Sequence, residues 1–481
     1  MSWLRKRHER ALEGDFQAAA LQSLKIICRE TEGLDDLTSP DGMRVMYGLA
    51  GLVDNDPDER SQSTVQEEAL KCLSNLLLKN PHLAELCQTE GVLEGVMKRI
   101  ANRGSVSLSS GIKFFDARLL FLVTALAPKS RCLITRELHG IPSLVRALQL
   151  DIVDASGNLV RYTDEKSRDM CELLKVLYSL TLDIDGLDEQ DFKALDGLVH
   201  VVRLVLLSED PGWSTDIKSH AINILINMPS RCVSMLVPSV TVQEEPAAVV
   251  SMYEDCDVSA IDALIAHLLQ TLSCVELDSP ANAVISILTA MRSCAKSSRI
   301  IRKHMRGKIL PPLHHVTARP EDSGGLKSLL VQQMTSHITH LKEMVADFLF
   351  ILCKENVSRL IKHTGYGNAA GMLFQRGLLG GDQPSASSEY SSDEDSDTNE
   401  YLESDLDPIT GGPVGPKLDA NEDLTEEEKE VEAVKLMHLF QQLNSNSCLK
   451  VVPIGEDGKP LLPDGNKEGE AVDSDDEVNG D

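Results

Sequence analysis

The chain has 481 residues, is 42% hydrophobic but only 4% aromatic, and carries a formal net charge of −28. Such a composition favours helices packed on helices, and one extended array fits this length better than several globules. Residues 381–481 hold 28 Asp and Glu against 6 Lys, whereas residues 1–380 hold 47 against 41 Lys and Arg. This acidic tail disfavours nucleic acid as the main ligand. The tail either binds a basic protein partner, binds a basic patch of the same chain, or serves only to stay soluble and disordered.

Eleven cysteines are scattered along the chain, with no CxxC pair and no Cys/His cluster at the spacing of metal ligands. This pattern is typical of reduced core cysteines, so we expect no metal site and no cofactor. The first ten residues are too polar for a signal peptide, and no run approaches the roughly 20 apolar residues of a membrane span. We expect a cytoplasmic monomer without direct membrane insertion, which allows recruitment to the plasma-membrane cortex.

Apolar residues recur with helical spacing through most of the chain. The first predicted helix covers residues 15–31, and Ser39 followed by Pro40 predicts the start of the next through an N-cap and a first-turn proline. Equivalent centres at Leu73, Leu122, Leu177, Leu225, Leu288 and Leu349 lie 49, 55, 48, 63 and 61 residues apart. Armadillo and HEAT repeats have roughly 40 to 47 residues, so we expect insertions between the repeats.

One such repeat cannot cover its own apolar face, so neighbouring repeats must stack. The prediction is an all-α, armadillo/HEAT-type solenoid over residues 1–380 with almost no sheet. An acidic linker (381–423), a tail helix (424–444) and a disordered acidic tail (445–481) follow it. Residues 237–258 form the longest irregular insertion, which we interpret as a surface loop.

Two segments invite a functional interpretation. Residues 297–320 carry six Lys and Arg and form either a solvated helix face or a dock for an acidic segment. The sequence GYGNAA (365–370) formally matches the dinucleotide motif GxGxxA, but that motif must join a strand to a helix, and here it follows a predicted helix. A tight glycine turn into the last helix fits better. Motifs for covalent chemistry are absent, so we do not expect an enzyme.

The candidate sites are therefore binding surfaces. Lys25 and Arg29 are expected one helical turn apart on one face, and Asn75, Asn223 and Asn227 lie inside otherwise apolar repeat helices. An amide in that position can hydrogen-bond the backbone of a peptide in the groove of a solenoid, or it can cap a neighbouring helix.

The tail combines a predicted helix with predicted phosphorylation sites. Thr425 and Glu428 form a capping box, and the helix that follows carries an apolar stripe that should dock on the body or on a partner. The stripe consists of Ala433, Leu436, Met437, Phe440 and Leu443. Ser391 and Ser392 have acidic residues three positions on, which is the pattern that an acidophilic kinase reads. Each phosphate would add about −1.5 to −2 charges.

Seven segments, in order along the chain, resemble the synembryn family, also called resistance to inhibitors of cholinesterase. They are FFDARLLFLVTAL (114–126), ELHG (137–140), ILPPLHHVTARPE (309–321), ADFLFILC (346–353), TGYGNAAG (364–371), YSSDEDSDTNEY (390–401) and LTEEEKEVEAVKLMHLFQQL (424–443). By comparison with the family, the chain lacks roughly one repeat before Phe16. We therefore expect an uncapped N-terminal edge or an incomplete sequence.

The resemblance implies a chaperone and guanine-nucleotide exchange factor for G-protein alpha subunits. Such a protein binds GDP-bound alpha subunits free of beta-gamma and stabilises the nucleotide-free state. The alpha subunit's C-terminal helix would lie in a concave groove at Lys25, Arg29, Asn75 and His220, and phosphorylation would fall on Ser391 and Ser396. An importin-type transport adaptor is the alternative, but it needs ladders of Trp and Asn that Trp3 and Trp213 cannot supply. A passive scaffold is a third interpretation.

Overall fold

The computed structural model describes most of the chain up to residue 378 and a few residues beyond it. The described residues are 2–30, 33–53, 63–104, 108–154, 156–184, 186, 188–208, 214–240, 251–273, 281–313, 318–378, 406, 407, 409–413 and 435. They divide between two compact units. Unit 1 comprises Met1–Pro312 and Gly324–Lys354, and unit 2 comprises Leu313–Ser323 and Glu355–Asp481.

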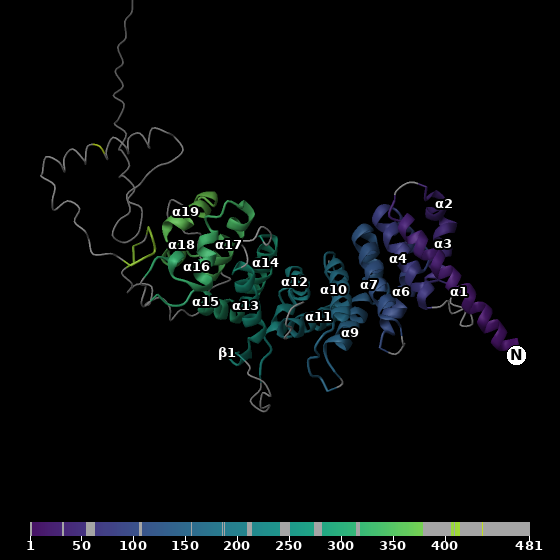
Figure 1. Cartoon of the computed structure of the whole chain (residues 1–481). Coiled ribbons are helices and arrows are strands. Elements are labelled where there is room, and N and C mark those ends of the chain that lie inside the picture. The colour runs from purple at the N-terminus through teal and green to yellow at the C-terminus, as the bar shows by residue number, and fades with distance from the viewer. Residues whose placement is uncertain are drawn as a thin grey trace, which may run out of the picture. The chain divides into compact units, whose positions relative to one another are not determined.

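Unit 1 consists almost entirely of helices (Figure 1). Its α-helices are α1 (Ser2–Ile27), α2 (Asp35–Thr38), α3 (Pro40–Leu49), α4 (Ser63–Lys79), α5 (Leu83–Thr89), α6 (Val92–Ala101), α7 (Ser110–Leu126), α8 (Lys129–Cys132), α9 (Gly140–Ile152), α10 (Asp164–Leu180), α11 (Glu189–Leu207), α12 (Ser214–Ile226), α13 (Ser259–Ser273), α14 (Ala281–Ser297), α15 (Arg299–Ile309), α16 (Gly325–Gln333) and α17 (Thr339–Leu352). A π-helix, η1 (Leu133–Glu137), and a 3₁₀-helix, η2 (Cys232–Leu236), lie between them.

The helix starts follow from local capping. Ser39 precedes α3 in extended conformation, and its side chain accepts a hydrogen bond from the Gly42 amide at 3.1 Å, which confirms the predicted cap. The predicted bounds of the first helix are wrong. α1 begins at Ser2 and ends at Ile27, because the chain turns at Cys28 to Glu30 with short-range bonds such as Glu30 N to the Ile27 carbonyl.

The predicted stacking of repeats is confirmed. Helices α1, α4, α7, α10, α12, α14 and α17 pack one against the next in that order, and they form what we call the inner row (Figure 1). The six predicted centres fall one on each helix of this row from α4 to α17, and each is at most 4% exposed. Helices α6, α9, α11 and α13 pack in sequence as a second layer. The described part of unit 1 is therefore an all-α helical-repeat solenoid.

The predicted surface loop at residues 237–258 is wrong for its described second half. Strands β1 (Met252–Tyr253) and β2 (Cys256–Asp257) pair there as an antiparallel hairpin, which is the one sheet among the described residues. Cys256, Asp257 and Val258 are buried, and Asp257 pairs with Arg203 of α11. The segment packs against α11 because the buried Asp257 carboxylate forms an ion pair with Arg203.

The basic segment at residues 297–320 is likewise not a solvated helix face. Arg302 and Arg306 of α15 are buried, and Arg302 donates to the Ala295 carbonyl at 2.8 Å. Arg299 and Lys303 pair with Glu254 in the β1–β2 turn at 3.2 and 2.9 Å. Arg299 and Lys303 therefore attach the hairpin to α15.

Unit 2 contains η3 (Pro320–Asp322), α18 (Val357–Thr364) and α19 (Tyr366–Gln375). The predicted glycine turn is confirmed: Gly365, with φ of 78°, separates α18 from α19. The tail helix at 424–444 lies outside the described residues except for Lys435. Among the described helices of both units, none combines the length and apolar character needed to cross a bilayer.

Candidate functional site

Paired positions on the inner row line one side of the solenoid. Each pair lies five and two residues before a buried centre: Glu68 and Lys71 before Leu73, Glu172 and Lys175 before Leu177, His220 and Asn223 before Leu225, and Ala283 and Ser286 before Leu288. On α7 the pair is Arg118 and Phe121, counted from buried Val123 rather than Leu122. We call these ten residues, with Lys25 of α1, the ladder face.

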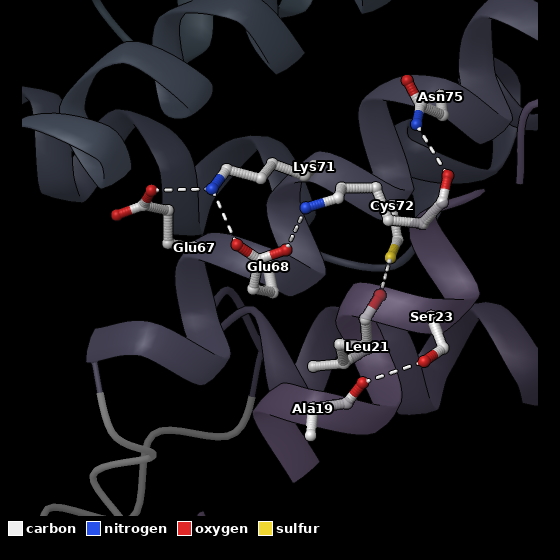
Figure 2. A network of polar contacts seen from close by, with 9 residues as sticks. Ala19, Leu21, Ser23, Glu67, Glu68, Lys71, Cys72 and Asn75 are labelled. Carbon is white, nitrogen blue, oxygen red and sulfur yellow. Dashed lines mark hydrogen bonds and ion pairs between the residues drawn. The ribbon is translucent and has the colours of Figure 1, made fainter. Parts of the chain in front are cut away.

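The first part of the ladder face joins α1 to α4. The Glu68 carboxylate accepts from Lys25 Nζ and from Lys71 Nζ, each at 2.7 Å, and Lys71 also pairs with Glu67 at 2.9 Å (Figure 2). Burial would raise the pKa of Glu68, but the hydrogen bonds from the two lysines outweigh it and hold the pKa below its usual value. The carboxylate therefore stays ionised beneath two half-exposed ammonium groups.

The second part repeats this arrangement on α10. The Glu172 carboxylate accepts from Lys175 Nζ at 2.6 Å and from Arg118 of α7 at 3.1 Å. Its side chain is only 6% exposed, whereas those of Lys175 and Arg118 are 21% and 31% exposed. Both parts of the face thus present cations outward with their counter-charges underneath.

Helix α7 supplies an aromatic ring to each lysine. Lys71 Nζ lies 5.6 Å from the ring centre of Phe115, and Lys175 Nζ lies 4.9 Å from that of Phe121. These are cation–π distances, so the rings fix the lysine head groups and also add apolar surface to the face. A face of this kind suits a peptide with carboxylates and apolar side chains.

The third part lies on α12 and α14. Burial and the neighbouring charge of Lys175 lower the pKa of His220, so its imidazole is neutral at pH 7. Asn223 lines a cavity of about 180 Å³ with Ser219, Ile222, Asn282, Ala283, Ser286 and Ile287. This hollow has polar and apolar walls and is large enough for one side chain.

The structure brings together some predicted site residues but not others. Lys25 lies on the ladder face, and His220 and Asn223 belong to it. Arg29 lies in the exposed turn beyond α1, so the expected helical turn between Lys25 and Arg29 is wrong. Asn75 Nδ2 donates to the Lys25 carbonyl at 3.1 Å, and Asn227 Nδ2 donates to Thr181 Oγ1 at 3.2 Å. Asn75 thus makes the contact that the capping alternative predicts. Asn227 lies just beyond α12 rather than inside it as predicted, and it bonds the side chain of Thr181, the C-cap residue of α10.

Replacing Asn75 by Ala is expected to lower the free energy of unfolding by about 1 kcal/mol, because the carbonyl at the end of α1 loses its side-chain donor. Chemical denaturation of the full chain measures this loss. Asn102→Ala is the control, since it removes an exposed amide whose Nδ2 donates to the Lys98 carbonyl four residues earlier rather than to a neighbouring helix of the row. Equal stability of Asn75→Ala and the wild type would contradict the capping contact.

Sequence patterns alone did not single out Glu68, Lys71, Phe115, Arg118, Phe121, Glu172 and Lys175. The signal was present, because Glu-x-x-Lys occurs at the same register in α4 and α10. The predicted tail-helix residues Leu436, Met437, Phe440 and Leu443 and the predicted phosphorylation sites Ser391, Ser392 and Ser396 lie outside the described residues.

The fold is an all-α array of helical repeats, and its ladder face carries polar and aromatic side chains. These features are typical of a repeat protein with an extended binding surface. The family model for the guanine nucleotide exchange factor synembryn matches residues 20–459, so the chain belongs to the synembryn family. This confirms the resemblance drawn from the seven sequence segments.

Individual relatives agree with this assignment. The chain is 33% identical to chaperone Ric-8A of Gallus gallus over 95% of this chain and 85% of that protein, and 35% identical to chaperone Ric-8A of Macaca fascicularis over 93% and 84%.

Among solved structures the chain is similar to an engineered protein, at 16% identity over 78% of this chain and 82% of that one, with a TM-score of 0.41.

Proposed function

We propose that this chain binds isolated alpha subunits of G proteins, assists their folding and accelerates their nucleotide exchange. Membership of the synembryn family supports the class of partner. The observation that carries the assignment to a surface is the repeated Glu-x-x-Lys arrangement of the ladder face, with its partly exposed lysines held over buried carboxylates.

The proposed ligand of the ladder face is the C-terminal helix of the alpha subunit. A chain end carries a carboxylate that Lys71, Arg118 or Lys175 can bind, and apolar side chains of such a helix can pack on Phe115 and Phe121. Further contacts are assigned to Lys25, Arg29, His220 and Asn223, and to the amide oxygens of Asn75 and Asn227, whose nitrogens donate within the solenoid. The bound subunit is GDP-bound or nucleotide-free and is without its beta-gamma partner.

Exchange needs no catalytic side chain. A protein that binds the nucleotide-free alpha subunit more tightly than the nucleotide-bound one must weaken nucleotide affinity by the same factor, because coupling between two sites is reciprocal. Stabilising the nucleotide-free state also explains chaperoning, since ligands that bind only folded states favour folding.

The tail has two proposed roles beside the solenoid. The helix at 424–444 contacts the same subunit through Leu436, Met437, Phe440 and Leu443. An acidophilic kinase modifies Ser391, Ser392 and Ser396 in the linker at 381–423. The protein acts as a cytoplasmic monomer that is recruited to the plasma-membrane cortex with its partner.

A pull-down with matched partner states tests this function. Immobilised full-length chain is incubated with an alpha subunit that is nucleotide-free, GDP-loaded, or GDP-loaded and complexed with beta-gamma. We expect capture to decrease in that order. Equal capture of the first two states would identify a passive scaffold, and no capture of any state would contradict the proposed function.

A further inference from the structure

The glycine turn between α18 and α19 holds a second segment of the same chain. The Gly367 amide donates to the Ile409 carbonyl at 3.1 Å, although 42 residues separate them. A Cβ on Gly365 would lie 2.7 Å from the Thr410 carbonyl oxygen, closer than real Cβ atoms approach. The absence of side chains on this turn therefore allows backbone-to-backbone contact.

The bound segment has its own tight fold. Asp407 Oδ1 accepts from the Ile409 amide at 2.9 Å, and Asp407 Oδ2 accepts from Thr410 Oγ1 at 3.0 Å. The backbone closes with Gly411 N to Asp407 O at 2.7 Å, and Leu406 bridges to Pro413. We call the described residues 406, 407 and 409–413 the return turn. An Asx-stabilised turn of this kind is preformed for docking.

The other wall of the binding site is η3. Gly411 is buried with φ of 68°, and a Cβ there would lie 2.8 Å from Pro320 Cγ and 2.8 Å from the Gly365 nitrogen. Asn368 fixes the two walls together, since its Nδ2 donates to Glu321 Oε2 at 3.2 Å and to the Thr364 carbonyl at 2.9 Å. Three residues of the GYGNAA sequence thus form one binding site for the return turn. Gly365 leaves room for its backbone, the Gly367 amide donates to it, and Asn368 links α19 to η3.

We propose that this site is a clasp that anchors the tail and sets the reach of the helix at 424–444. Thr425 follows Pro413 by 12 residues but follows Leu378 of the body by 47 residues. Fully extended, these lengths reach about 40 Å and about 160 Å. Effective concentration falls roughly as the −3/2 power of linker length, so opening the clasp lowers that of the tail helix about eightfold.

The role in reach rests on the proposed function, whereas the clasp itself does not. Hydrogen exchange in the full-length chain therefore tests the clasp separately. Gly411→Ala forces a Cβ against Pro320 and Gly365, and we expect the Gly367 amide to exchange at least about tenfold faster. Gly377→Ala is the matched control, because Gly377 also has φ of 68° but has open space around it. Asp407→Ala is a second variant, which loosens the return turn without altering its receptor.

Affinity for an isolated alpha subunit tests the reach. Gly411→Ala and Asp407→Ala are expected to weaken binding about eightfold, and Gly377→Ala to leave it unchanged. In the full-length double variant Leu436→Asp, Phe440→Asp, adding Gly411→Ala should have no further effect, because the tail helix no longer contributes. Unchanged exchange at Gly367 would overturn the clasp, and faster exchange with unchanged affinity would overturn its role in reach. Failure of the wild-type chain to bind the subunit would overturn the proposed function and the role in reach, but not the clasp.

Discussion

Replacing Lys175 by Glu is expected to weaken binding of an isolated alpha subunit by at least about tenfold. The new carboxylate would replace the Lys175 ammonium, which lies 2.6 Å from Glu172 and over the ring of Phe121. The face would then repel a carboxylate ligand and lose a cation–π contact. Titration of the subunit against the full-length variant measures the loss.

Two further variants separate charge from folding. Lys175→Met keeps the aliphatic stem on Phe121 and removes only the charge, so its loss of affinity should be smaller than that of Lys175→Glu. Lys129→Glu makes the same change in net charge at an exposed position of α8 that is not among the ladder-face residues, and it should bind like the wild type. Wild-type affinity of Lys175→Glu would show that the ladder face does not bind the subunit.

Replacing Arg103 by Leu is expected to lower the free energy of unfolding by about 3 to 5 kcal/mol. Arg103 is 6% exposed and pairs with Asp169 of α10, and Asp116 of α7 and Asp151 of α9 act on the same guanidinium. Its removal leaves the buried Asp169 carboxylate without its cation. Chemical denaturation measures the change.

A double variant tests whether the cost comes from the charge left behind. Arg103→Leu with Asp169→Leu should recover part of the loss, because no unpaired carboxylate then remains at position 169. An exposed pair is the control: removing Arg231, whose partner Glu189 is 68% exposed, should cost far less than removing Arg103, because solvent screens an exposed ion pair. A loss as small for Arg103→Leu as for Arg231→Leu would contradict the account of the buried network.

The inner row could be predicted because its signal is local. Leu73, Leu177 and Leu288 mark apolar stripes that follow from helical periodicity, and a stripe without internal cover must face a neighbour. The hairpin at β1 and β2 could not be predicted in this way. It depends on Asp257 meeting Arg203, which lies 54 residues away in the sequence.

The ladder face was harder to predict than the row on which it lies. Contacts such as Lys71 with Phe115 or Arg118 with Glu172 join residues about 50 positions apart, and propensity within one helix does not reveal them. The equal registers of Glu68–Lys71 and Glu172–Lys175 would have indicated a shared face. The sequence leaves peptide binding and helix capping open for Asn75 and Asn227, and it could not show that Lys25 and Thr181, at the ends of neighbouring helices, already bond these amides.

The clasp shows the same limit at the other end of the chain. The sequence predicts a glycine turn at Gly365, because a glycine there permits positive φ. It does not reveal that the turn receives Ile409 and Gly411, since main-chain recognition depends on backbone geometry. A motif that formally matches a nucleotide site is in this chain a site for its own tail.

The rate of GDP release from an isolated alpha subunit is the direct measure of the proposed exchange activity. Labelled GDP is followed with saturating wild-type chain, with Lys175→Glu and with no added chain. We expect the wild type to accelerate release. At concentrations too low to saturate the subunit, Lys175→Glu should accelerate release less than the wild type does. Release that is unchanged at saturating wild-type chain would contradict the exchange activity.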